Sequence, residues 1–95
     1  MLTGLRSHSM GKRARAKRTG RWLQESRTGT RMEYADIDID EAFVCGAQVL
    51  AFHPRTSDPL AFIWPDGRLS FNSTYFSHGD ARELVAEVAA LATRP

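Results

Sequence analysis

The side chains with the clearest chemical potential are six cations that fall between residues 11 and 21. This segment reads GKRARAKRTGR and holds no acid and no large apolar residue. Lys and Arg at this density can neutralise several phosphates and release their counterions, which supplies affinity without sequence choice. The predicted phosphate contacts are Lys12, Arg13, Arg15, Lys17, Arg18 and Arg21. A solubilising or targeting tail is the alternative interpretation.

The charge of the chain changes sign at about residue 31. Residues 1–31 hold nine Lys or Arg and one acid, a net charge of +8, whereas residues 32–95 hold four Arg and ten acids, a net charge of −6. We expect a basic arm, residues 1–21, that is flexible until a polyanion neutralises it, followed by an acidic domain, residues 22–95. Trp22 at this boundary is a candidate for stacking on an unpaired base, or alternatively a packing anchor.

Three aspartates, Asp36, Asp38 and Asp40, alternate with apolar residues over 34–40. Residues two apart on a strand stand about 6.6 Å apart on one face, so the pattern predicts a row of carboxylates. This row is interpreted either as a solvated face or as a docking strip for a basic segment of this chain or of a partner. A calcium loop is disfavoured, because Glu41 stands where such a loop needs glycine.

Aromatic residues cluster around a predicted hairpin and exceed what one helix can cover. Strand alternation puts Phe62 and Trp64 on one face and Phe71 on the other. Aromatic surface left on the face away from the helix, with Trp64 in it, predicts a site of protein interaction or self-association.

Side chains suited to catalysis are scarce in this sequence. There is no nucleophile elbow and no glycine-rich phosphate loop, and Cys45 lies in an apolar segment that we interpret as a strand, where thiols are usually inert. His53 is interpreted as a strand-end residue, and His78 as part of a first helical turn. We therefore expect a protein without enzymatic activity, cofactor or metal ion.

The compartment is predicted from cysteine content and hydropathy. A single cysteine excludes an intramolecular disulfide and fits a reducing compartment. No apolar run approaches the roughly 20 residues that span a bilayer. We expect a cytoplasmic protein without membrane contact, or a nuclear or mitochondrial one in a eukaryote.

The elements that position these residues follow from periodicity and turn signals. Alternation over 34–40 predicts a half-buried strand, with a short first strand over 21–26 paired to it. Residues 43–52 predict a central strand with a candidate bulge at Gly46, and a short buried helix capped by Asp40 stays open as an alternative. Residues 60–64 and 68–72 predict a hairpin, because Pro65, Asp66 and Gly67 suit a three-residue turn.

The C-terminal segment predicts an amphipathic helix of about 14 residues that ends near Thr93. Ser77 and Asp80 have the spacing of a capping box before it. The fold class is therefore α+β: an antiparallel meander of four to five strands with one C-terminal helix on one face, preceded by the basic arm.

These patterns favour a non-enzymatic protein that binds DNA or RNA through its arm. The alternative is a small protein-interaction factor, an inhibitor or adaptor of a larger assembly, that uses Asp36, Asp38, Asp40 and Trp64.

Overall fold

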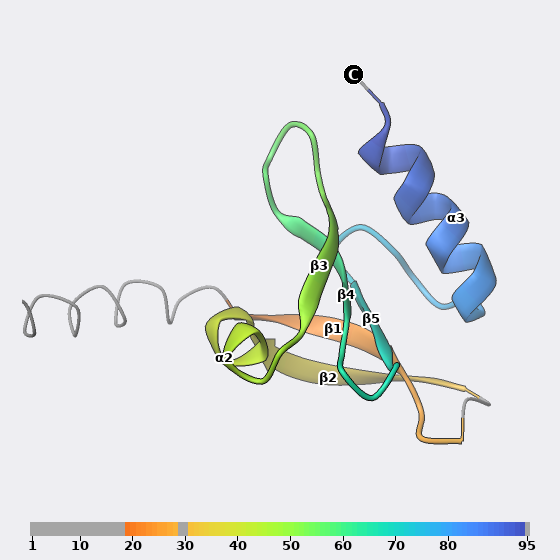
Figure 1. The fold of residues 1–95 in the computed structure, drawn as a ribbon. Coiled ribbons are helices and arrows are strands. Elements are labelled where there is room, and N and C mark those ends of the chain that lie inside the picture. The colour runs from red at the N-terminus through yellow and green to blue at the C-terminus, as the bar shows by residue number, and fades with distance from the viewer. Residues whose placement is uncertain (1–18, 29–30, 95) are drawn as a thin grey trace, which may run out of the picture.

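Five strands pair antiparallel in one sheet within the described residues, 19–28 and 31–94, of the computed structural model (Figure 1). The elements are β1 (Thr19–Glu25), β2 (Met32–Asp38), α2 (Ile39–Val44), β3 (Gln48–Phe52), β4 (Pro59–Ile63), β5 (Leu69–Asn72) and α3 (Ala81–Ala92). The predicted α+β class, the number of strands and the C-terminal helix are confirmed. No helix in this part of the chain is long and apolar enough to cross a bilayer.

The strand order is β2-β1-β5-β4-β3, which differs from a continuous meander at one connection. β1 and β2 form one hairpin, and β3, β4 and β5 form a meander. The chain passes between them through α2, from one edge of the sheet to the other. The two parts join where β1 pairs with β5, with Leu23 opposite Phe71.

The sheet has a buried core on each face, because neighbouring residues of a strand point to opposite sides. Leu23, Leu60, Phe71, Phe76, Leu84 and Val88 pack under α3. Trp22, Ile37, Ile39, Ala42, Ala47 and Phe62 pack on the opposite face with α2. The predicted helix on one face is therefore joined by a second, short helix on the other (Figure 1).

The central strand predicted over 43–52 is a strand only at 48–52, which forms β3, and it lies on the sheet edge. Residues 39–44 form α2, and a turn follows in which Gly46 has a φ of +93°. The alternative of a buried helix over 43–52 is also wrong for most of this segment, since only residues 43–44 of it are helical, and Asp38 rather than Asp40 is the N-cap. Its Oδ1 accepts hydrogen bonds from the backbone N–H groups of Asp40 and Glu41, at 3.0 and 3.3 Å. Such a cap satisfies N–H groups that a helix end leaves unpaired.

The β4–β5 hairpin confirms the turn prediction. Trp64 N–H bonds Arg68 C=O and Gly67 N–H bonds Trp64 C=O, both at 2.9 Å, and Gly67 has a φ of +91°. At α3 the N-cap is Asp80 rather than Ser77, because the Asp80 carboxylate accepts from the N–H of Glu83 at 2.9 Å. The helix then ends at Ala92, close to the predicted position.

Candidate functional site

The basic arm is described only at its C-terminal end. Lys12, Arg13, Arg15, Lys17 and Arg18 lie outside the described residues. Arg21 lies on β1, which begins three residues before the predicted domain start, and its side chain is 64% exposed. Its Nε is 3.9 Å from Asp36 Oδ1, and its guanidinium lies 5.6 Å from the ring centroid of Tyr34. Arg21 is thus accessible to an anion.

Trp22 is a core residue, which corrects its prediction as a base-stacking side chain. It is only 1% exposed, and its ring centroid lies 4.8 Å from that of Phe62. The packing alternative therefore holds: no face of the indole is open for a base. The indole Nε1 is buried and has no hydrogen-bond partner in the described part of the chain.

The predicted row of three aspartates does not form, because β2 ends at Asp38. Asp36 lies opposite Arg21 on the sheet, Asp38 caps α2, and Asp40 lies in the first turn of that helix. Since Asp38 pairs with Thr19 in the sheet register, the acidic residues lie where the basic arm joins β1. The Asp38 carboxylate accepts hydrogen bonds from N–H groups of α2, so its main role is to cap this helix rather than to bind a partner.

The histidines and the cysteine occupy structural positions. His53 follows β3, as predicted, and its Nδ1 accepts the N–H groups of Arg55 and Thr56 at 3.1 and 3.3 Å. His78 precedes α3 instead of lying in its first turn, and its ring meets Tyr34 edge-on. Cys45 is the exposed C-cap of α2, so its placement in an apolar strand is wrong.

Trp64 is half-buried and belongs to a chain of contacts on the β4–β5 hairpin. Its Nε1 donates to the buried Ser70 Oγ at 2.9 Å, and the Arg68 guanidinium lies 5.0 Å from its ring centroid. Arg68 Nε donates to Asp66 Oδ2 at 2.9 Å, and the N–H of Arg68 donates to Asp66 Oδ1 at 3.0 Å. These contacts hold the Arg68 side chain in one orientation.

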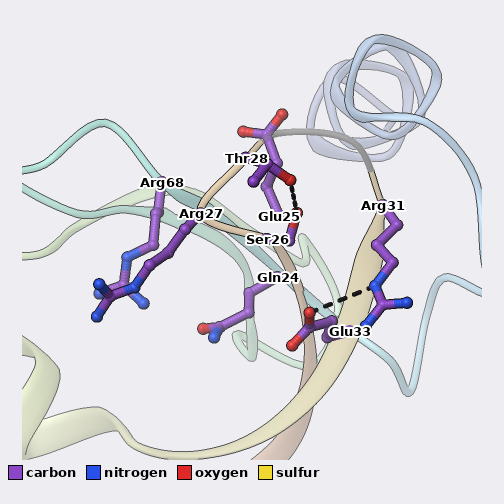
Figure 2. Close-up of a pocket in the computed structure, with 8 residues that line it drawn as sticks. All are labelled: Gln24, Glu25, Ser26, Arg27, Thr28, Arg31, Glu33 and Arg68. Atoms are coloured by element: carbon purple, nitrogen blue, oxygen red, sulfur yellow. Dashed lines mark hydrogen bonds and ion pairs between the residues drawn. The ribbon is translucent and has the colours of Figure 1, made fainter.

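Arg68 also lines an open pocket of about 620 Å³ at the end of the sheet where β1 turns into β2. Its charged residues are Arg27, Arg31, Arg68, Glu25 and Glu33, and Gln24, Ser26 and Thr28 complete the lining. Figure 2 shows Arg27 and Arg68 reaching in the same direction on one side, with Arg31 and Glu33 on the other. Arg31 Nε is 3.6 Å from Glu33 Oε2.

Sequence reasoning missed the arginines of this pocket. Arg27 lies in the turn after β1, and Arg68 lies one residue before β5, close to the strand start predicted at residue 68. Their proximity follows only from the pairing of β1 with β5, which sets Gln24 opposite Ser70. The one signal in the sequence that could have indicated this site is Arg68, a cation that directly follows the Pro65–Asp66–Gly67 turn and is close to Trp64.

The exposed Asp66 carboxylate has a pKa below its ordinary value of 3.8, chiefly because the backbone N–H of Arg68 bonds to it. A lowered pKa stabilises the fold at pH values above the ordinary pKa, and this contribution disappears as the pH falls through the lower, folded value. We expect Asp66→Asn to lose less stability than the wild type between about pH 5 and pH 2 in urea unfolding. Equal losses in both proteins would contradict the role of Asp66.

No group of three His, Cys, Asp or Glu side chains within residues 19–28 and 31–94 is arranged to hold a metal ion. Comparison of the chain with models of protein families, with curated proteins and with solved structures finds no match in any of the three. Its function is therefore inferred from its own residues.

Proposed function

We propose that this chain is a non-enzymatic nucleic-acid-binding protein whose basic arm contacts backbone phosphates. The observation that carries the proposal is the separation of charge, with six cations and no acid between residues 11 and 21 and an excess of acids after residue 31. A polyanion fits the basic segment and is repelled by the acidic part, so binding is directed to the arm.

The anchoring of the arm supports this function. Arg21 belongs to β1, and β1 is paired on both sides, with β2 and with β5. The last cation of the segment is therefore held by an interior strand of the sheet. Because β1 is part of the sheet, a nucleic acid that binds the arm also fixes where the domain lies relative to it.

The salt dependence of binding tests the proposal directly. Full-length protein is titrated into fluorescent DNA and RNA, both single-stranded and duplex, at increasing salt. If about five phosphates are neutralised, log K falls against log salt with a slope of about −4.5 for duplex and −3.5 for single strands. That slope corresponds to a loss of about 500-fold for duplex between 50 and 200 mM salt. A flat salt response, or no binding at low salt, contradicts the proposal.

A second candidate function, protein interaction, is favoured by exposed apolar side chains on α2 and the edge strand. Val44 is 86% exposed, and Leu50 and Phe52 of β3 are 47% and 48% exposed. An edge strand also presents unpaired backbone groups on its outer side. The acidic residues are less suited to this role, since Asp38 is a helix cap. Capture from lysate with and without nuclease separates the two functions, because nuclease removes only partners tethered by nucleic acid.

A further inference from the structure

We propose that Arg27 and Arg68 form a second phosphate-binding site, which contacts the backbone of the same nucleic acid that the basic arm binds. This inference rests on the proposed function and assigns a further site to it. The site lies on the sheet face that carries α2, at the opposite end of β1 from Thr19, where the arm enters this strand.

Arg68 is prepared for phosphate recognition by contacts that leave part of its guanidinium available. Asp66 engages Nε, and the Trp64 ring supports the planar group. A guanidinium has five N–H donors, so four remain on the two terminal nitrogens. The Arg68 side chain is 33% exposed. A fork held in place loses little entropy when it binds a phosphate.

Arg27 supplies the second cation from a separate element, the turn between β1 and β2. It is exposed and forms no ion pair with another described residue. Because Arg27 and Arg68 reach to the same side of one pocket (Figure 2), an anion between them would relieve their mutual repulsion. The two arginines come from different loops, and both offer N–H donors to an anion in the pocket.

The acidic residues of the pocket limit where the anion lies. Glu33 is paired with Arg31 on the side away from Arg27 and Arg68. A phosphate is therefore expected beside the latter two arginines, and Glu33 opposes it at longer range. The variant Glu33→Gln should therefore strengthen nucleic-acid binding, whereas loss of Arg27 and Arg68 should weaken it.

The distance from the arm makes the two contacts independent. The last cation of the arm, Arg21, lies four residues before the end of β1 at Glu25, a separation of about 13 Å at about 3.3 Å per residue. One strand of a DNA duplex carries a phosphate about every 3.4 Å along the axis, so about four phosphates separate this cation from the pocket. Contacts to different phosphates should contribute additively to the affinity.

The test compares full-length variants in salt titrations with a 20-nucleotide strand and its duplex, as DNA and as RNA. We expect Arg27→Gln/Arg68→Gln to bind about 10- to 100-fold more weakly than wild type at about 100 mM salt, with a salt slope smaller by about 1 to 2. The matched control is Arg55→Gln/Arg82→Gln, which removes the same charge at exposed positions outside the pocket. We expect this control to change affinity less than about twofold.

The outcomes separate the second site from the function of the arm. Binding by wild type together with equal slopes in the Arg27/Arg68 variant and its control overturns the second site and leaves the arm's function intact. No binding by wild type overturns both. Should the double variant lose its folded circular dichroism spectrum, Arg27→Gln, on an exposed turn, and Glu33→Gln decide the matter: unchanged affinity in both also overturns the site.

Discussion

Replacing Lys12, Arg13, Arg15, Lys17 and Arg18 by glutamine should weaken nucleic-acid binding by about a thousandfold or more at about 100 mM salt. Each lost phosphate contact means that about one counterion fewer is released on binding. The loss of five contacts should therefore reduce the slope of log K against log salt almost to the value for the domain without its arm. The measurement is the same fluorescence titration with full-length protein. The substitutions precede β1, so the unfolding midpoint of the domain should not change.

A charge-conserving variant of the arm is the matched control. Exchanging every Lys for Arg and every Arg for Lys over residues 12–18 keeps the charge and alters the shape of each donor. We expect the affinity of this variant to stay within about threefold of wild type, because point charges suffice for counterion release. Full binding by the glutamine variant would show that the arm does not contact phosphates.

Trp22→Ala should lower the free energy of unfolding by about 3–5 kcal/mol. Trp22 is fully buried against Phe62, so truncation leaves a cavity between the sheet and α2. A domain of this size is stabilised by about 4–11 kcal/mol, so the loss is a large share of the total. Urea unfolding followed by circular dichroism measures it.

Trp22→Phe distinguishes the packing of the ring from its polar atom. Phenylalanine fills much of the space and removes the buried, unpartnered Nε1, whose burial costs about 1–3 kcal/mol. The net destabilisation should therefore be about 1 kcal/mol or less. Gly20 fits beside this atom, since a Cβ there would come within 3.1 Å of it. Equal destabilisation by Phe and Ala would contradict this expectation, because a phenyl ring would then recover none of the packing of the indole.

The elements that sequence reasoning predicted well are those with local signals. The β4–β5 turn is specified by three consecutive residues, Pro65, Asp66 and Gly67, and the apolar residues of α3 recur at helical spacing. Residues 43–52 were harder, because an unbroken apolar run has no period that separates a helix from a strand. The decisive residue was Asp38, whose role as a helix cap competes with its place in the alternating strand.

The candidate sites divide along the same line. The basic arm is evident from charge alone, because its chemistry does not depend on contacts with the rest of the chain. The Arg27 and Arg68 site depends on the pairing of β1 with β5, and the burial of Trp22 depends on α2 covering that face. Neither pairing has a signal in the sequence near the residues concerned.

The pairing of β1 with β5 also has a consequence for how the chain folds. Leu23 and Phe71, which face each other across this pair, are 48 positions apart, whereas the other strand pairs close locally. An isolated two-stranded hairpin is only marginally stable in water, so the β1–β2 hairpin should not persist alone. Closure of this long loop should therefore limit the folding rate. During synthesis the basic arm and the first hairpin leave the ribosome well before β5, and the sheet cannot be completed until β5 follows.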